Sequence, residues 1–233
     1  MKIALVGYGK MGKIIDQIAT ERGHEIVARL NETPNLNNLN QPDVVIEFSQ
    51  PEVAFENIRF CIDNQIPVIS GTTGWLEKKS EIEALTLEKG TAFLYGSNFS
   101  LGVNLFFALN ERLAQLMQPF DEYQTQLKEI HHTHKKDAPS GTAISLAEGI
   151  IKNNPKFDSW KLDETEKHQV GIFAERIDEV PGTHHVYYRS EVDEIEIKHT
   201  AFSRNGFALG AVIASEWIIG KKGNFTMNDV LGI

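Results

Sequence analysis

The sequence predicts an α/β protein in which an N-terminal Rossmann-like dinucleotide-binding domain is joined to an α+β domain with a mixed sheet. Three observations predict this fold. Apolar strands alternate with amphipathic helices over residues 1–95, the pattern of βαβ units and a parallel sheet. A glycine-rich turn, Gly7–Gly12, follows the first strand. From residue 104 onward, strands follow one another without crossover helices, which favours a second, mixed or mostly antiparallel sheet.

The first half of the chain consists of apolar runs of strand length, separated by turn residues and helical patterns. Lys2–Val6 is apolar without alternation, as expected for a strand buried on both faces of a parallel sheet. We expect strands at Lys2–Val6, Glu25–Leu30, Asp43–Phe48, Pro67–Ser70 and Thr91–Tyr95. We also expect three helices. The first includes Ile14–Ala19, the second runs from Pro51, a first-turn proline, to about Asn64, and the third covers Glu77–Lys89.

The second half begins with a long amphipathic helix and continues with strands. We expect helices at Asn104–Met117 and Ala143–Lys152, and strands at Tyr123–Ile130, His168–Ile177, His184–Arg189 and Glu194–Phe202. The alternation of Glu194–Lys198 indicates a sheet with one covered face. The last helix, Phe207–Ile219, has an apolar face that is expected to return to the first domain. The predicted domains are therefore residues 1–103 with 206–233 for the dinucleotide, and residues 104–205 for the substrate.

Composition limits the class of protein. The 233 residues are 41% hydrophobic and 24% charged, which permits a substantial core. The formal charge of −9 disfavours nucleic acid as a partner. A single cysteine, Cys61, excludes an intrachain disulfide, and its place in an apolar-periodic stretch predicts a core thiol. No apolar run is long enough for a membrane span, and Met1 leads directly into a strand, so we expect no membrane partner and a cytoplasmic location.

Gly7, Gly9 and Gly12 have the spacing of a dinucleotide-binding turn between a strand and a helix. In that motif the first glycine permits the turn, the second lets the backbone approach a pyrophosphate, and the third lets the helix pack on the strand. The alternative is a glycine-rich turn that binds no ligand. The agreement of all three spacings and both flanking elements favours the dinucleotide.

The acidic residue that normally binds the adenosine ribose about 20 positions further on is not clearly present. Asn31 stands where it is expected, and Glu32 comes one residue late. Arg29 shares a face of its strand with Asn31 and could accept a 2′-phosphate. The sequence therefore leaves the choice between NADH and NADPH open.

Two further loops lie at the carboxyl ends of predicted strands, Gly71–Gly74 and Gly96–Ser100. The ligand crevice of an open α/β sheet forms at these ends. Small hydroxyl and amide side chains there would leave room for a nicotinamide and its ribose. Either loop alone is also compatible with an ordinary turn, but together with the glycine turn they favour a dinucleotide site.

His131–Thr142 is a basic segment in an acidic protein, with three of the eight histidines and two adjacent lysines. Ser140 is a candidate N-cap, so the amides of Gly141 and Thr142, with the Thr142 hydroxyl, would bind a carboxylate. A histidine and a lysine beside it suit proton donation to a developing amine or enamine.

Three alternatives for this segment are a metal site, a solvated loop and a phosphate site. No cysteine or well-spaced carboxylate joins the histidines, so we expect no metal. Hydride chemistry at a neighbouring nicotinamide favours a carboxylate over a phosphate. The remaining histidines carry less weight, although His184 or His185, where a turn leads into a strand, could approach the pocket.

The chain resembles the dihydrodipicolinate (4-hydroxy-tetrahydrodipicolinate) reductase family. The resemblance rests on Gly7–Gly12, Gly71–Thr73, Ser97–Asn104 and, most specifically, the Glu129–Thr142 pattern, and it extends to Phe207–Ile219 and Phe225–Leu231. It implies NAD(P)H-dependent reduction of a small cyclic dicarboxylate, with loss of water, in lysine and diaminopimelate synthesis. It also implies a homotetramer assembled through the sheets of the second domain. The chain departs from many members at Asn31, where they carry Glu or Asp.

The resemblance also assigns roles to individual residues. His131 is the implied acid/base, Lys135 the proton donor and His132 a substrate contact, and Gly141 with Thr142 binds a carboxylate. Together with Asn31, the expected cofactor residues are Gly7, Tyr8, Gly9, Lys10, Met11, Gly12, Gly71, Thr72, Thr73, Gly96, Ser97, Asn98 and Phe99. The competing hypotheses are another two-domain amino-acid dehydrogenase, acting on aspartate or diaminopimelate, and a catalytically silent NAD(P)-sensing or scaffold protein.

Overall fold

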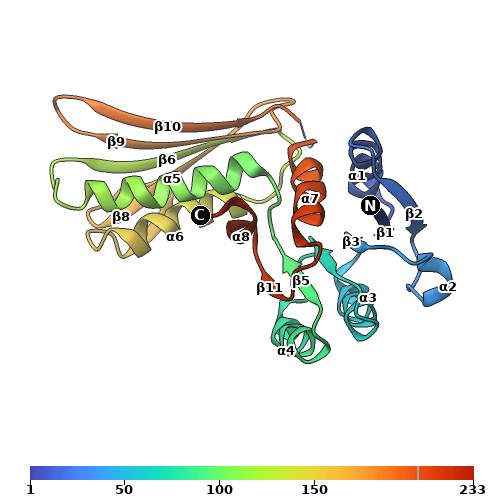
Figure 1. The fold of residues 1–233 in the computed structure, drawn as a ribbon. Helices are drawn as coiled ribbons and strands as arrows, with labels where there is room; N and C mark the ends of the chain where they lie inside the picture. Colours follow the sequence, from blue (N-terminus) through green and yellow to red (C-terminus); the bar gives the residue numbers. More distant parts are fainter. Residues whose placement is uncertain (204) are drawn as a thin grey trace. The chain divides into compact units, whose positions relative to one another are not determined.

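The computed structural model describes residues 1–203 and 205–233, which form two compact units (Figure 1). The first unit is Met1–Leu101 together with Asn205–Ile233, and the second is Gly102–Arg204. Both ends of the chain belong to the first unit, so the second unit is an insertion within it.

The first unit is built on a six-stranded parallel sheet in the order β11-β5-β4-β3-β1-β2. The strands are β1 (Lys2–Val6), β2 (Glu25–Leu30), β3 (Val44–Glu47), β4 (Val68–Ser70), β5 (Ala92–Tyr95) and β11 (Gly223–Phe225). The helices are α1 (Lys10–Glu21), α2 (Leu36–Leu39), α3 (Pro51–Asp63), the 3₁₀ turn η1 (Leu76–Lys78), α4 (Lys79–Lys89), α7 (Asn205–Ile218) and α8 (Met227–Leu231). The strand order reverses between β1 and β3, which makes the carboxyl ends of these two strands the expected ligand position.

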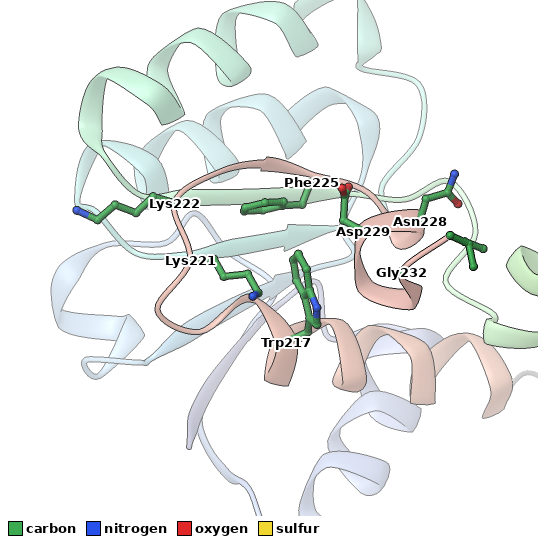
Figure 2. A pocket seen from close by; sticks show the side chains of 8 residues that line it. Trp217, Lys221, Lys222, Phe225, Asn228, Asp229 and Gly232 are labelled. Atoms are coloured by element: carbon green, nitrogen blue, oxygen red, sulfur yellow. The ribbon is translucent and has the colours of Figure 1, made fainter.

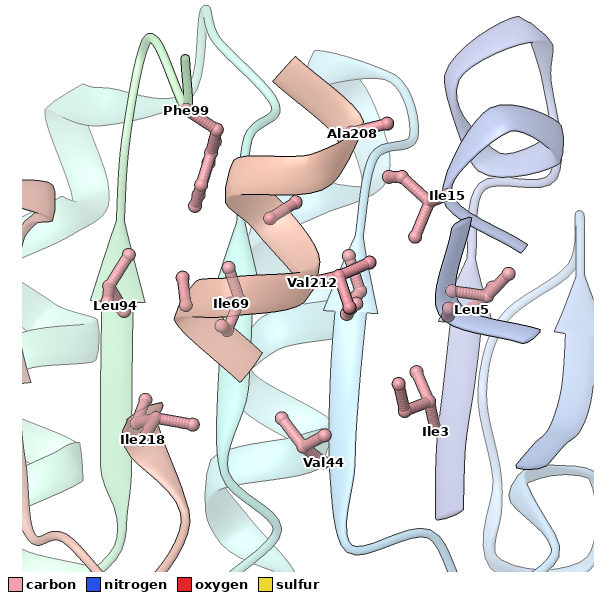
Figure 3. Packing of buried hydrophobic residues seen from close by; sticks show 14 of the residues in the cluster. Ile3, Leu5, Ile15, Val44, Ile69, Leu94, Phe99, Ala208, Val212 and Ile218 are labelled. Atoms are coloured by element: carbon pink, nitrogen blue, oxygen red, sulfur yellow. The ribbon is translucent and has the colours of Figure 1, made fainter. Parts of the chain in front are cut away.

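Helices cover both faces of this sheet and bury two apolar clusters. On one face, side chains of β1, β3, β4 and β5 pack against α1 and α7, as Figure 3 shows for Leu5, Ile69 and Val212. On the other face, the sheet packs against α3 and α4, where Cys61 is 1% exposed. The expected core thiol and the expected return of the C-terminal helix to the first domain are both confirmed.

The second unit contains a mixed five-stranded sheet in the order β10-β9-β6-β8-β7. Its strands are β6 (Gln124–His131), β7 (Ser159–Leu162), β8 (Gln169–Arg176), β9 (Gly182–Arg189) and β10 (Glu194–Ala201). The pairs β10–β9 and β9–β6 are antiparallel, whereas β6–β8 and β8–β7 are parallel. The helices α5 (Leu101–Met117) and α6 (Gly141–Asn153) lie on one face of the sheet (Figure 1).

Most predicted elements agree with the structure to within a few residues, and the differences have local causes. Helix α5 begins at Leu101 rather than Asn104, and α6 begins at Gly141, directly after its cap, rather than at Ala143. No clear sequence pattern predicted α2, β7, β11 and α8, which have three to five residues each. The alternation in β10 predicts that both isoleucines lie on a covered face, but only Ile197 packs on the core of the unit. Ile195 is 38% exposed.

No helix in the described part of the chain combines the length and the apolar character that crossing a membrane requires.

Candidate functional site

The turn between β1 and α1 forms the centre of a candidate nucleotide site in the first unit. Gly7 has φ +94°, and a Cβ atom there would lie 1.9 Å from the carbonyl oxygen of Phe48. A Cβ atom on Gly12 would lie 2.4 Å from the carbonyl oxygen of Gly7, whereas one on Gly9 would meet nothing within 4 Å. Packing therefore requires the two outer glycines. The middle glycine leaves open space at the helix N-terminus, which fits a pyrophosphate.

A pocket of about 270 Å³ lies beside this turn, at the carboxyl ends of β1 and β3. It is lined by Val6, Gly7, Gly9, Asn31, Glu32, Thr33, Phe48, Ser49, Gln50, Val53 and Asn57. The pocket thus gathers three of the predicted cofactor residues, Gly7, Gly9 and Asn31. It also includes residues after β3 that sequence reasoning missed, although their position at the end of a strand was a usable signal.

Asn31 has a structural task in this pocket. Its Oδ1 atom accepts a hydrogen bond of 2.7 Å from the backbone amide of Tyr8. This bond ties the end of β2 to the glycine turn and leaves Glu32 as the carboxylate of the pocket. Of the other predicted residues in the turn, Lys10 is exposed, and Met11 packs partly buried against the core.

The guanidinium of Arg29 is already engaged within the first unit. Arg29 Nε lies 2.5 Å from Asp16 Oδ2, and Arg29 Nη2 lies 3.0 Å from Asp16 Oδ1. The proximity of Arg29 to Asn31 expected from strand alternation does not bring Arg29 into the pocket lining. The free arginine that a 2′-phosphate would need is therefore absent from this lining.

A buried carboxylate organises the loops after β3 and β4. Glu47 is fully buried and accepts hydrogen bonds from Ser49 N (3.0 Å), Ser70 Oγ (2.7 Å) and Thr72 Oγ1 (3.0 Å), and a further one from the Ser49 hydroxyl. Burial raises the pKa of Glu47, and the surrounding donors oppose that shift. Sequence reasoning missed Glu47, although an acidic residue inside an apolar strand was its signal.

The loops Gly71–Thr73 and Gly96–Phe99 contribute to the first unit in different ways. Thr73 and Ser97 are exposed and accessible to a ligand. Thr72 is buried and donates to Glu47, and Phe99 is 2% exposed within the core, so any contact of Phe99 with a ligand would use its backbone.

The remaining residues of these loops are constrained by their own contacts. A Cβ atom on Gly71 would lie 2.2 Å from the ring of Phe48, and one on Gly96 would lie 3.1 Å from the ring of Phe99. Asn98 Oδ1 accepts a hydrogen bond of 2.9 Å from the backbone amide of Ser100. Both loops therefore pass close to aromatic rings.

In the second unit, a buried cluster forms where β6 meets β9. Glu129 pairs with His184 across these strands, and His131 is two residues further along the same face. Glu129 Oε2 lies 3.6 Å from His131 Nδ1 and 3.8 Å from His184 Nε2. The two rings meet edge to face, with centroids 5.0 Å apart. Of His184 and His185, His184 is the one that joins His131.

Burial sets the charge of these histidines. It lowers the pKa of His131, although the carboxylate of Glu129 opposes the shift. Burial, together with the neighbouring histidines and Lys135, lowers the pKa of His184 to about 3. Both rings are therefore neutral at pH 7. His184 Nε2 lies 3.2 Å from the hydroxyl oxygen of Ser140, which links the cluster to the start of α6.

Arg176, at the end of β8, holds the basic segment in place and was not singled out from the sequence. Its Nη2 atom donates to Glu129 Oε1 at 3.1 Å and to the carbonyl oxygen of Asp137 at 2.6 Å. Lys135 Nζ lies 2.7 Å from Asp137 Oδ2, and this lysine lowers the pKa of Asp137. The segment thus keeps a positively charged Lys135 beside the buried cluster.

The start of α6 is arranged as the sequence predicts. Ser140 is the N-cap, and its side chain accepts a hydrogen bond from the amide of Ala143 at 3.2 Å. Among the described residues, no hydrogen bond engages the amides of Gly141 and Thr142, and a Cβ atom on Gly141 would meet nothing within 4 Å. These amides and the open space beside them fit a carboxylate at a helix N-terminus.

His132 follows the buried cluster but is only half-buried. Its Nδ1 atom is buried and has no hydrogen-bond partner within residues 1–203 and 205–233. Its ring centroid lies 6.2 Å from that of His134, which is exposed. His132 therefore retains hydrogen-bonding capacity for a substrate.

The sequence-based statement that no carboxylate joins the histidines is wrong. Glu129, His131 and His184 place three potential ligand atoms within 4.8 Å of one another. The same carboxylate, however, is paired with the guanidinium of Arg176 and accepts the amide of Ser140 at 3.0 Å. A cation would have to compete with both, so the donor set fits a hydrogen-bonded cluster better than a metal centre.

A separate pocket lies among α7, β11 and α8, where Trp217 and Phe225 meet edge to face with centroids 5.0 Å apart (Figure 2). Lys221 Nζ lies 4.2 Å from the centroid of the Trp217 ring. None of the predicted site residues lines this pocket.

The Rossmann-like unit with its glycine turn, together with the His–Lys cluster on a mixed sheet, defines an NAD(P)H-dependent oxidoreductase. Comparison with known proteins then identifies the family. The family model described as "Dihydrodipicolinate reductase, N-terminus" matches residues 1–99, and the one described as "Dihydrodipicolinate reductase, C-terminus" matches residues 102–231. The chain belongs to the dihydrodipicolinate reductase family, as the resemblance in the sequence implied.

A curated relative supports this assignment, and two solved structures share the fold. The chain is 50% identical over 233 residues to a 4-hydroxy-tetrahydrodipicolinate reductase of Christiangramia forsetii, with 99% of this chain and 98% of the relative covered. Its fold is similar to that of a dipicolinate-bound dihydrodipicolinate reductase from Paenisporosarcina sp. TG-14, with a TM-score of 0.79, 21% identity and 98% of both chains covered. An amine dehydrogenase from Mycobacterium smegmatis shares the fold at a TM-score of 0.60 and 10% identity, with 98% and 95% covered.

Proposed function

We propose that the chain reduces 4-hydroxy-tetrahydrodipicolinate to tetrahydrodipicolinate, with loss of water, in lysine and diaminopimelate biosynthesis. The observation that carries this proposal is the buried Glu129–His131–His184 cluster, linked to the free amides at the start of α6 and followed by Lys135. The cluster provides neutral histidines, a cationic lysine and an anion site within a single unit. These groups can bind a carboxylate of the substrate and donate a proton to its reacting centre.

In the first unit, the residues present fit a dinucleotide. The open space at Gly9 and the amides at the start of α1 accommodate a pyrophosphate, and Asn31 and Glu32 offer hydrogen-bonding groups to a ribose. The exposed Thr73 and Ser97 are assigned to the nicotinamide side. NADH or NADPH, when bound, supplies the hydride.

In the second unit, the amides of Gly141 and Thr142 bind one substrate carboxylate, and His132, whose ring is only half-buried, contacts the substrate. Lys135, held by Asp137, adds a positive charge and carries the proton to be donated. His131 is neutral at pH 7, so it serves as the acid/base partner that exchanges a proton with the reacting centre. One hydride and one proton enter, and the ring hydroxyl leaves as water.

The decisive experiment measures oxidation of NADH and of NADPH in the presence of freshly synthesised 4-hydroxy-tetrahydrodipicolinate. The proposed function predicts substrate-dependent loss of absorbance with at least one cofactor, and formation of tetrahydrodipicolinate. Aspartate-derived imines and diaminopimelate, tested in parallel, separate this function from that of the other two-domain amino-acid dehydrogenases. If both cofactors bind but neither is oxidised with any substrate, the chain is a sensing or scaffold protein instead.

The proposed assembly is a homotetramer formed through the sheet of the second unit. In the described part of that unit, α5 and α6 lie on one face of the sheet, and no helix of the unit lies on the other (Figure 1). That other face carries a stacked His185–Tyr187 pair, with centroids 5.6 Å apart. Analytical ultracentrifugation tests this assembly, and a monomer at working concentration would rule it out. The cytoplasmic location and the lack of a metal remain predictions from the sequence.

A further inference from the structure

The ion pair between Asp16 and Arg29 joins the glycine turn to the second strand of the first unit. Asp16 lies in α1, and its Oδ2 atom accepts hydrogen bonds of 2.5 Å both from the hydroxyl of Tyr8 and from Arg29 Nε. Its other oxygen accepts from Arg29 Nη2 at 3.0 Å. The side chain of Asp16 is 12% exposed and that of Arg29 is 45% exposed. One partly buried carboxylate thus binds the fork of an arginine at the surface.

Arg29 is in the part of the fold where a 2′-phosphate would be recognised. It is the last but one residue of β2, and the end of that strand is tied to the glycine turn by the Gly7 N to Leu30 O hydrogen bond of 2.8 Å. In Rossmann folds the adenosine ribose lies at this strand end, and an arginine nearby accommodates the 2′-phosphate of NADPH. Here the donors that would perform that task, Nε and Nη2, both point to Asp16.

The neighbouring charges favour a free ribose hydroxyl over a phosphate. Glu32 lines the pocket next to Asn31 and can accept a hydrogen bond from a 2′-hydroxyl, whereas it would repel a phosphate. The charge of Arg29 is neutralised by Asp16. Lys10, exposed at the first position of α1, is available to the pyrophosphate of either cofactor and so does not distinguish them.

We propose that Asp16 is a specificity-determining residue: by binding the guanidinium of Arg29, it makes this chain favour NADH over NADPH. The inference rests on the proposed function, because it concerns the cofactor of the proposed reductase. Asp16 itself does not contact the cofactor and acts by positioning Arg29. The preference for NADH therefore depends on a contact between α1 and β2 and not on the residues that line the pocket.

The test is a pair of equilibrium titrations, one with NADH and one with NADPH, followed by cofactor fluorescence without substrate. The wild type is expected to bind NADH more tightly. Asp16→Asn and Asp16→Ala both release Arg29, and because a charge-assisted hydrogen bond to phosphate becomes available, the NADPH/NADH affinity ratio is expected to rise about tenfold or more. Asp16→Asn keeps the shape of the side chain and an acceptor for Tyr8, so it provides the answer if Asp16→Ala folds poorly.

Two further variants decide whether Arg29 carries the effect. In an Asp16→Asn background, Arg29→Ala is expected to return the affinity ratio to the wild-type value. The matched control is Glu216→Gln, which breaks a similar arginine pair between the C-cap of α1 and α7, Arg22 Nη2 to Glu216 Oε2 at 2.7 Å, and is expected to leave the ratio unchanged.

The outcomes separate the inference from the function on which it rests. If Arg29→Ala alone selectively weakens NADPH binding in the otherwise wild-type chain, Arg29 already serves the phosphate and the inference is overturned. It is also overturned if the Asp16 variants bind both cofactors with the wild-type ratio. If neither cofactor binds the wild type, the proposed function itself fails, and the inference fails with it.

Discussion

Arg176 Nη2 lies 3.1 Å from Glu129 Oε1, and this carboxylate is completely buried. The arginine compensates the buried charge and, through the carbonyl oxygen of Asp137, fixes the loop that carries Lys135. Arg176→Ala should therefore lower the free energy of unfolding by about 3–5 kcal/mol, because it leaves Glu129 as an uncompensated buried charge. Urea denaturation monitored by tryptophan fluorescence measures this loss.

The control for this prediction lies on the same two strands. Lys128 Nζ and Glu175 Oε1 form a pair of 2.8 Å in which both side chains are about one-third or more exposed. Lys128→Ala should cost no more than about 1 kcal/mol, because exposed pairs contribute little. Equal losses for Arg176→Ala and Lys128→Ala would mean that the buried carboxylate does not depend on its arginine.

Lys135 should be needed for the chemical step more than for cofactor binding. Removing a positioned general acid typically costs about 10²–10⁴-fold in rate, so Lys135→Ala should lower kcat by that factor. The affinity for NADH, measured by titration without substrate, should remain nearly the same. Lys136→Ala, at the adjacent exposed position, serves as the control and should retain most of the activity. An unchanged kcat in Lys135→Ala would refute the role of Lys135 as the proton donor.

The glycine turn allows packing to be separated from binding. Gly12→Ala places a methyl group 2.4 Å from the carbonyl oxygen of Gly7, so the free energy of unfolding should fall by about 1–3 kcal/mol. Gly9→Ala meets no neighbouring atom and should change stability by less than about 1 kcal/mol. It should nevertheless weaken NADH binding, because the methyl group enters the space assigned to the pyrophosphate. If Gly9→Ala binds NADH like the wild type, the pyrophosphate does not lie there.

Glu47 should connect stability to cofactor binding in the first unit. Glu47→Gln turns one acceptor into a donor facing Ser49, Ser70 or Thr72, so about 1–3 kcal/mol of stability should be lost together with NADH affinity. The matched control is Thr86→Val, which removes the buried hydrogen bond from Thr86 Oγ1 to the carbonyl oxygen of Ile82 in α4. It should lower stability but leave NADH affinity unchanged. Loss of affinity in both variants would indicate a general effect of destabilisation.

The regular parts of the fold could be predicted from local sequence patterns. The apolar run Lys2–Val6 and the proline at position 51 each indicate one element, because buried strands and first helical turns have strict local requirements. The N-cap at Ser140 follows from the same kind of rule and led directly to the free amides of Gly141 and Thr142. Short elements such as β11, with only three residues, depend on tertiary pairing and have no such signal.

The candidate site could be predicted only where its residues are close in the sequence. His131, His132 and Lys135 stand in one segment, whereas His184 and Arg176 join them through pairing of β6 with β9 and with β8. In the same way, strand alternation placed Arg29 near Asn31 but could not show that Asp16, on a helix, binds it first. Such contacts depend on the register and orientation of whole elements.

His184 should make the protein less stable in mild acid. Its pKa is lowered to about 3 in the folded state, so between pH 6.5 and 3 the unfolded chain binds a proton that the folded chain does not. Stability therefore falls as the pH falls through this window, by about 2 kcal/mol at pH 5. Urea denaturation at pH 7 and pH 5 should show that His184→Gln loses less stability on acidification than the wild type does. His134→Gln, at an exposed position, should behave like the wild type, and an identical pH response in all three proteins would contradict the neutral, buried state of His184.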